Sequence, residues 1–267
     1  MRLKVLHRTT YRYERPLSYG LQELRLTPKS RPGQEVLHWE TQIEGGQREA
    51  EFDDQHKNHV MLISFQGGGH EIVVTSRGEV VTTDNAGLVG RHQGFAPLWL
   101  FEQSTDLTRP GPLVRKLIHG LAGEEPEPLP RLHRLSARIR DAVAYLLGKT
   151  DSETKAETVL EHGQGVCQDH AHVFITAARA MGFPARYVSG YLMMDDRVGQ
   201  DATHAWAEAH VEELGWVGFD VSNGISPDER YVRVATGLDY HEAAPILGLR
   251  FGDHGAESLA VDIQVQQ

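Results

Sequence analysis

Short runs of alternating apolar and polar residues dominate the first 83 positions of the chain. Glycines and prolines separate these runs, which cover residues 3–13, 21–26, 36–43, 60–65 and 72–81. Alternation of this kind is typical of strands that bury one face, and several short strands with turns between them favour a sandwich or a barrel. We therefore expect residues 1–83 to form an antiparallel, sandwich-like or barrel-like N-terminal β domain.

The pattern changes after residue 83. Residues 84–130 are rich in glycine and proline, and the run Glu-Glu-Pro-Glu-Pro at 124–128 is typical of an exposed connection. Apolar residues then recur at helical spacing and would share one helix face: Leu132, Leu135, Ile139, Val143, Leu146 and Leu147. We expect a connection at 84–130 and a second domain, the core, at 131–267.

A second helix and three strands are predicted within the core. The apolar spacing of residues 167–181 indicates a helix, which a glycine and a proline then end. Strands are expected at 185–194, 203–211 and 216–221. Within 203–211, alanines alternate with larger polar residues, so the alanine face would let the preceding helix pack closely. The whole chain is thus expected to be an α+β protein whose core packs a helix on an antiparallel sheet.

The composition is that of a globular protein, since 40% of the 267 residues are hydrophobic and 24% are charged. A net charge of −10 argues against a nucleic-acid partner or an anionic membrane, because both attract cationic proteins. No apolar run is long enough to span a membrane, and the first residues do not resemble a signal peptide. We expect a cytoplasmic protein with neither kind of partner, and no pattern in the sequence fixes its oligomeric state.

Cys167 is the only cysteine in the chain, and it lies where the second predicted helix begins. It therefore permits no internal disulfide, and a free thiol suits a reducing compartment. The exposed N–H groups and the dipole of a helix start favour a negative charge, so a thiol there should ionise readily. Cys167 is accordingly a candidate nucleophile. The alternative is that a lone cysteine is a small, buried hydrophobic residue.

His204 and Asp220 are the candidate base and its orienting carboxylate. A thiol nucleophile needs a base within hydrogen-bond reach, and the base needs a group that fixes its tautomer and stabilises its cation. A tight hairpin between the two predicted strands would put Asp220 opposite Glu208, about 13 Å from His204. For the two residues to meet, we expect residues 209–215 to form a loop or bulge.

The histidines also permit a metal site. His170 and His172, with His204 or His210, could supply imidazole ligands. A spacing of two, however, puts His170 and His172 on different faces of a helix. We therefore expect no metal at these histidines, and acyl transfer by a thiol nucleophile requires no organic cofactor.

Four motifs follow one another in the second half of the chain. They are Gly-Val-Cys-Gln-Asp-His-Ala-His at 165–172, Gly-Phe-Pro-Ala-Arg-Tyr-Val-Ser-Gly-Tyr at 182–191, Thr-His-Ala-Trp-Ala-Glu at 203–208 and Gly-Trp-Val-Gly-Phe-Asp at 215–220. Together they resemble the bacterial transglutaminase-like family. The resemblance implies a papain-like core behind a β-rich N-terminal domain, with Cys167 as nucleophile, His204 as base and Asp220 as orienting carboxylate.

Two positions depart from the usual pattern of that family. Val221 follows Asp220 where the family usually has a proline, so this segment lacks the fixed φ of proline. Leu238 stands where the family usually has an arginine, in a Gly-Arg-Asp-Tyr motif. The second change affects the substrate rim and leaves the triad intact.

The expected function is acyl transfer on a peptide or amide substrate through a thioester, and hydrolysis is favoured. Members of the family are described as cysteine proteases, amidases or transglutaminases, so the alternatives are a transglutaminase and a non-catalytic binding module on the same core. The candidate substrate-rim residues are Gln168, Trp206, Trp216 and Asn223. The segments 195–197, 199–201 and 222–224 are polar or glycine-rich, and a wet rim would admit water to a thioester.

Overall fold

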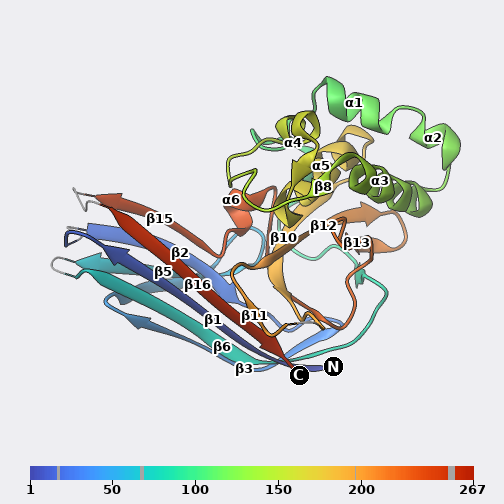
Figure 1. Ribbon diagram of the computed structural model, residues 1–267. Helices are drawn as coiled ribbons and strands as arrows, with labels where there is room; N and C mark the ends of the chain where they lie inside the picture. Colours follow the sequence, from blue (N-terminus) through green and yellow to red (C-terminus); the bar gives the residue numbers. More distant parts are fainter. Residues whose placement is uncertain (17–18, 67–68, 196, 252–255) are drawn as a thin grey trace.

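The computed structural model describes the chain except for residues 17–18, 67–68, 196 and 252–255. Two stacked antiparallel sheets form one end of the molecule, and a sheet covered by helices forms the other (Figure 1). The expected α+β class, with an antiparallel N-terminal sandwich and a helix-on-sheet core, is confirmed.

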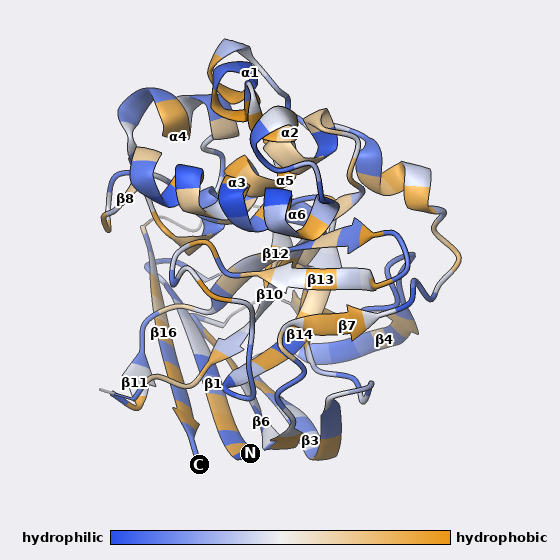
Figure 2. Cartoon of the chain, turned by 90° about the vertical axis from the view of Figure 1, so that its right-hand side faces the viewer, coloured by the Kyte–Doolittle hydropathy of each residue, from blue (hydrophilic) through white to orange (hydrophobic). Residues whose placement is uncertain are grey.

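The sandwich consists of a sheet of five strands and a sheet of four. The order in the first is β11 (Gly199–Gln200), β16 (Glu257–Gln266), β1 (Arg2–Tyr13), β6 (Glu71–Thr82) and β3 (Gln34–Glu44). The order in the second is β15 (Ile246–Phe251), β2 (Tyr19–Thr27), β5 (His59–Gln66) and β4 (Gln47–Asp53). Alternate residues meet between the sheets in one apolar cluster, which includes Tyr11, Leu24, Ile63 and Val74. Bands of alternating hydropathy are visible along β1 and β16 in Figure 2.

The last strands of the chain return to this sandwich. β16 pairs antiparallel with β1, with Gln266 opposite Lys4, and β15 pairs antiparallel with β2. The two ends of the chain therefore lie side by side (Figure 1). These strands, Ile246–Phe251 and Glu257–Gln266, were expected to belong to the core at 131–267, whereas their hydrogen-bonding partners lie in the N-terminal sheets. An alternating pattern identifies the buried face of a strand but not the strand that pairs with it.

The core sheet has the order β14 (Tyr231–Gly237), β10 (Ala185–Leu192), β12 (His204–Val211), β13 (Gly215–Phe219) and β7 (Leu88–Gly90). The α-helices gather on one side of it (Figure 1). They are α1 (Pro112–Ile118), α2 (Leu121–Glu124), α3 (Pro128–Ala142), α4 (Ala156–His162), α5 (Cys167–Ala180) and α6 (Tyr240–Ala243). The short helix η1 (Leu98–Glu102) precedes them, and its Phe101 packs against Trp216. A short parallel pair, β8 (Ala144–Tyr145) and β9 (Gln164–Gly165), precedes α5.

Helix α5 is the centre of the core and is buried from residue 169 to residue 179. The alanine face of β12 packs in the same cluster as Phe174 and Ile175 of this helix, which confirms the expected close packing. The helix begins after the extended residue Val166, whose N–H is held by the Asp169 carboxylate at 2.7 Å. It ends at Gly182, which has a left-handed φ of 85°.

Helix α3 is shorter than its apolar pattern predicted. Leu132, Leu135 and Ile139 are buried as expected, but Leu146 and Leu147 lie beyond the helix and are exposed. The backbone turns extended at Val143 because the next residues pair with β9 as strand β8.

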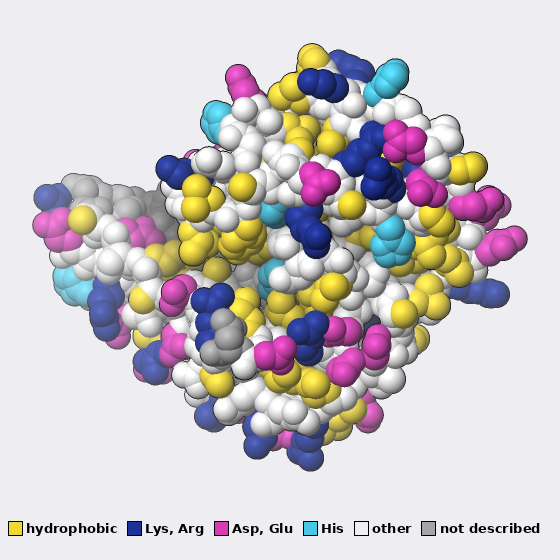
Figure 3. All heavy atoms as spheres, turned by 45° about the vertical axis from the view of Figure 1, so that its right-hand side comes forward, with side chains coloured by type: hydrophobic (Ala, Val, Ile, Leu, Met, Phe, Trp, Pro, Cys, Tyr) yellow, Lys and Arg dark blue, Asp and Glu magenta, His cyan; other side chains and the backbone are white. Residues whose placement is uncertain are grey.

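A further apolar cluster joins the two halves of the molecule. Leu3, Val5 and Val80 of the sandwich pack against Tyr191 and Val232 of the core sheet. On the face shown in Figure 3, acidic, basic and apolar side chains are interspersed. Within the described part of the chain, no helix has the length and apolar character needed to cross a membrane.

Candidate active site

Cys167 is the first residue of α5, as predicted, and it is half-buried. Because it opens the helix, its N–H has no acceptor within the helix. The short β8–β9 pair and the Asp169 carboxylate fix the chain just before it. The thiol and a free backbone donor are thus presented together at the end of a rigid helix.

His204 lies at the start of β12 between the thiol and a carboxylate. Its Nε2 is 2.6 Å from Oδ2 of Asp220, and the imidazole also makes a hydrogen bond with the Cys167 side chain. Because Nε2 faces Asp220, Nδ1 is the ring nitrogen left for the thiol. The three residues singled out in the sequence therefore form one continuous chain of side chains.

The strand register that brings His204 and Asp220 together differs from the expected one. β12 and β13 form a tight hairpin, with Val211 opposite Gly215 and Ala207 opposite Phe219. The expected loop or bulge at 209–215 is therefore wrong. Continued by one residue, the observed register puts Asp220 opposite Trp206, so His204 is its diagonal neighbour on the same face and lies within side-chain reach.

Asp220 is fully buried and is held by more than the imidazole. Oδ2 accepts hydrogen bonds from the Tyr231 hydroxyl at 2.7 Å and from Nδ2 of Asn223 at 2.7 Å. Burial alone would raise the pKa of Asp220, but the hydrogen bonds and the charge of His204 outweigh it and lower that pKa. Asn223, expected at the substrate rim, is exposed and also orients the carboxylate. Tyr231 was not predicted, because no local motif marks it.

The same neighbours stabilise the protonated form of His204. Burial alone would lower its pKa, but hydrogen bonds and charge interactions with Asp220 and Cys167 raise the pKa to about 10. An imidazolium held between a thiol and a carboxylate suits a group that delivers a proton to a leaving amine.

Trp206 packs on the imidazole. The rings of Trp206 and His204 are stacked 6.2 Å apart, and Tyr231 meets Trp206 edge-on at 5.4 Å. Trp206 is 3% exposed, so it packs behind the imidazole and does not form an open wall of the rim.

Trp216 lies away from this site, contrary to its expected place at the substrate rim. It is opposite His210 in the β12–β13 pair and is 1% exposed. Its ring packs edge-on against Phe101 at 5.1 Å, and the Arg186 guanidinium lies 3.9 Å from the ring centroid. A fully buried indole in a separate cluster offers no accessible surface to a substrate.

Two further side chains border the thiol. Gln168 follows Cys167 in α5 and is half-buried, as a rim residue should be. Tyr145 of β8 is 53% exposed and stacks on His170 at 6.1 Å. Tyr145 lies opposite Gly165 in the β8–β9 pair, two residues before Cys167. Partial burial and then the charge of Cys167 raise the pKa of Tyr145. Tyr145 was not identified from the sequence because its segment was expected to be helical.

The histidines considered as metal ligands have separate partners. Nε2 of His170 donates to the carbonyl of Val143 at 2.9 Å, and Nε2 of His172 accepts from the N–H of Tyr240 at 3.2 Å. His210 packs against Trp216 at 5.5 Å. Among the residues that the structure describes, no group of three or more His, Cys, Asp or Glu side chains could hold a metal ion.

Known protein families match both halves of the chain. Residues 115–221 match the model of the transglutaminase-like superfamily, and residues 3–81 match that of the bacterial transglutaminase-like N-terminal region. An uncharacterized protein of Mycobacterium leprae is 30% identical over 99% of this chain and 98% of its own length. An uncharacterized protein of Mycobacterium tuberculosis is 38% identical over 50% of this chain and 45% of its own length.

A solved structure has the same overall fold. It is the crystal structure of a protein from Cytophaga hutchinsonii described as a candidate cysteine protease, and the match covers 100% of this chain and 90% of that one. The TM-score is 0.77 and the sequence identity is 20%.

Proposed function

The chain belongs to the transglutaminase-like superfamily, and from that premise we propose that it is a cysteine-dependent acyl-transfer enzyme with Cys167, His204 and Asp220 as its triad. The observation that carries this proposal is the chain of contacts from the thiol through the imidazole to a carboxylate 2.6 Å away. Nucleophile, base and orienting group have the mutual geometry that thiol catalysis requires.

The reaction follows from these positions. The Cys167 sulfur attacks the carbonyl carbon of an amide, a C–S bond forms, and the carbonyl oxygen takes the negative charge. The Cys167 N–H at the start of α5 is a donor for that oxyanion. The His204 imidazolium gives its proton to the amide nitrogen, the C–N bond breaks, and a thioester and a free amine result.

Water completes the turnover. Neutral His204 takes a proton from a water molecule as its oxygen attacks the thioester carbon, and the C–S bond then breaks. The products are a carboxylic acid and the Cys167 thiolate beside a protonated His204. Asp220 keeps the ring oriented and stabilises its cation in both halves of the cycle.

We favour water over an amine as acceptor because exposed groups border the thiol. Tyr145 is 53% exposed, and Arg197 is exposed and near enough for its charge to act on the Tyr145 hydroxyl. Asn223, also exposed, follows the Asp220 end of the site; Asp196, part of the expected polar rim, lies outside the described residues. A transglutaminase needs a water-excluding approach to its thioester. The description of the Cytophaga protein as a candidate cysteine protease supports the same choice.

The proposal is tested by incubating the protein with a library of peptides that includes glutamine side-chain amides, with and without a primary amine at millimolar concentration. We expect carboxylic acid and released amine or ammonia as products, and no turnover by Cys167→Ala. Predominant amine conjugates would make the protein a transglutaminase. No turnover by a folded protein with a reactive Cys167 would favour a binding module on this core.

A further inference from the structure

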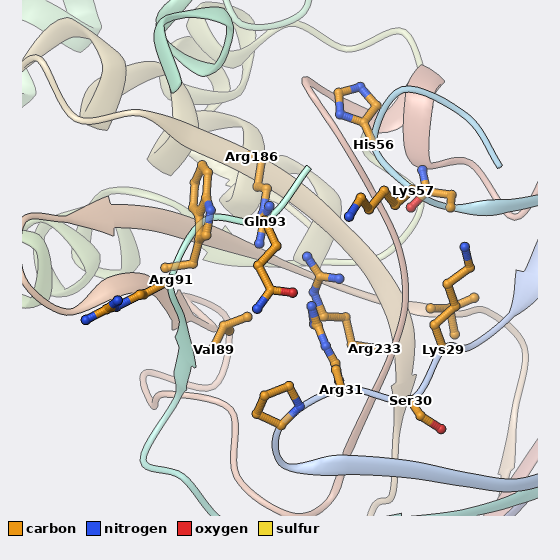
Figure 4. Close-up of a pocket in the computed structure, with 14 residues that line it drawn as sticks. Lys29, Ser30, Arg31, His56, Lys57, Val89, Arg91, Gln93, Arg186 and Arg233 are labelled. Carbon is orange, nitrogen blue, oxygen red and sulfur yellow. The ribbon is translucent and has the colours of Figure 1, made fainter. Parts of the chain in front are cut away.

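A second site lies on the opposite face of the core sheet from α5. Arg186 and Glu208 are opposite each other in the β10–β12 pair, and they alternate with the residues that pack under α5. Beside them is a cavity of about 160 Å³ between the core sheet and the sandwich. Lys29, Arg31 and Lys57 line it from the N-terminal half, as Figure 4 shows.

One buried carboxylate beside this cavity pairs with two of the arginines that line it. Glu208 is fully buried; Nε of Arg186 donates to its Oε2 at 2.6 Å and Nε of Arg233 to its Oε1 at 2.7 Å. Arg31 is a third guanidinium beside the pair; it is half-buried, and its side chain has no hydrogen bond or ion pair with any residue that the structure describes. Three guanidinium groups therefore lie beside one carboxylate.

Arg31 is held in surroundings that disfavour its charge. Burial, then the charges of Arg233 and Arg186, lower the pKa of Arg31 to about 8, although Glu208 opposes them. A half-buried cation whose neighbouring carboxylate is already bonded to two other arginines has lost part of its water and has no counter-charge of its own. Such an arrangement is expected where a bound anion supplies that counter-charge.

The lining groups converge on one point. In Figure 4, the side chains of Arg31, Arg233 and Gln93 are directed toward the same space, and Lys57 extends toward it from the sandwich side. Arg91 also lines the cavity but is directed away from the others in this view. Lys29 is already paired, with its Nζ 2.6 Å from Asp53.

We propose that this cavity binds a small phosphate-type oxyanion between Arg31 of the N-terminal half and Arg233 of the core. The planar guanidinium fork matches phosphate oxygens in pairs, and several arginines with a lysine and an amide suit a group with two charges and more than two acceptor oxygens. A carboxylate offers only two oxygens and one charge. The volume is below the roughly 300–1,000 Å³ of drug-sized sites, which fits inorganic phosphate or the phosphoryl group of a small phosphomonoester.

Calorimetric titration with inorganic phosphate and with glycerol 3-phosphate, at constant ionic strength, tests this directly. Sulfate and chloride serve as comparison anions. We expect saturable binding of one phosphate group per chain, weakened about tenfold or more in Arg31→Gln, since a charge-assisted contact is lost. The matched control is Arg48→Gln, which removes an exposed arginine of the same half that pairs with Glu51. Tighter binding of the phosphomonoester would identify a phosphoryl group of a larger ligand, and tighter binding of inorganic phosphate would identify the free ion.

Thermal unfolding gives an independent test, because the difference in unfolding temperature between Arg31→Gln and the wild type should change sign when phosphate is added. Without phosphate, Arg31→Gln should unfold at the same temperature as the wild type or higher, because the substitution removes a half-buried charge that lies beside two other guanidinium groups. With saturating phosphate the order should reverse, because only the wild type retains the full site. Absence of saturable phosphate binding, equal responses to chloride and phosphate, or wild-type affinity in Arg31→Gln would overturn the proposal. None of these readouts depends on Cys167 or on turnover.

Discussion

The hydroxyl of Tyr231 donates a hydrogen bond at 2.7 Å to the same Asp220 oxygen, Oδ2, that faces Nε2 of His204. Nδ2 of Asn223 also donates to this oxygen, at 2.7 Å. A carboxylate fixed from several directions cannot easily rotate away from the imidazole. The orientation of the imidazole therefore depends on a tyrosine in β14 as well as on the aspartate itself.

Substitution Tyr231→Phe removes one hydrogen bond to this buried carboxylate and keeps the ring. We expect kcat to fall about tenfold, since hydrogen bonds to charged groups contribute roughly 1.5–3 kcal/mol. KM should change little, because the orientation of the base is affected and no substrate contact is removed. Steady-state kinetics on a substrate found by the library screen measures both.

The matched control is Tyr191→Phe. Tyr191 is also a buried tyrosine, and its hydroxyl contacts Nδ1 of His7 at 3.0 Å, outside the candidate site. Equal kcat values for the two variants would contradict a positioning role for Tyr231.

The pH dependence should report the proton on His204. Its pKa is raised from 6.5 to about 10 in the folded protein, so the stability gained from binding this proton is complete below pH 6.5 and is lost as the pH rises through 10. If the imidazolium is the acid for the leaving amine, kcat/KM should decline near pH 10. Substitution Asp220→Asn removes the charge that raises this pKa, so the decline should move to lower pH. If kcat/KM declines at the same alkaline pH in the wild type and in Asp220→Asn, His204 is not that acid.

The sequence predicted the elements of the site better than their pairing. Helical spacing correctly put Cys167 at a helix start, and alternation put His204 and the buried alanines on opposite faces of one strand. The register of β12 and β13 was predicted wrongly, because strand pairing depends on the hairpin between the two strands and is not encoded by the alternation of either one. Trp216 shares a strand face with Asp220, but the distance along the strand takes it into another cluster.

Residues brought in by tertiary packing carried no local signal. Tyr231 opens β14, which β10 and β12 separate from β13 in the core sheet, and the loop between Asp220 and Tyr231 brings the hydroxyl to the carboxylate without a recognisable motif. Strands β15 and β16 complete the N-terminal sheets after the chain has traversed the whole core. Contacts between residues far apart in the sequence depend on the fold as a whole. The pattern within one segment therefore identifies a strand but does not show which strand it pairs with.

The sole cysteine makes the reactivity of the site directly measurable. At neutral pH, iodoacetamide should modify Cys167 in the folded protein, because the thiol is half-buried and the His204 imidazole beside it can take its proton. His204→Ala should slow this reaction markedly. His210→Ala, which changes a histidine of the same strand that packs on Trp216, should leave it unchanged. Labelling that requires prior unfolding would identify Cys167 as a buried structural residue.

The arginine cluster should make Glu208 one of the residues most important for stability. Glu208→Gln leaves the 9% exposed Arg186 and the 17% exposed Arg233 without a counter-charge. Removing one member of a buried ion pair costs about 3–5 kcal/mol, because the remaining charge stays buried and unpaired. We expect a loss of that order in the free energy of unfolding, measured by urea denaturation in phosphate-free buffer.

Glu40→Gln provides the exposed counterpart of this change. Glu40 is 48% exposed and pairs with the 55% exposed Arg77, so its loss should cost only about 0–1 kcal/mol. The two variants should also differ in how strongly phosphate stabilises them. With Glu208 neutralised, three arginines face the cavity without a carboxylate, so phosphate should stabilise Glu208→Gln more than it stabilises the wild type or Glu40→Gln. A phosphate response of Glu208→Gln no larger than that of Glu40→Gln would show that the arginines do not act together on a bound anion.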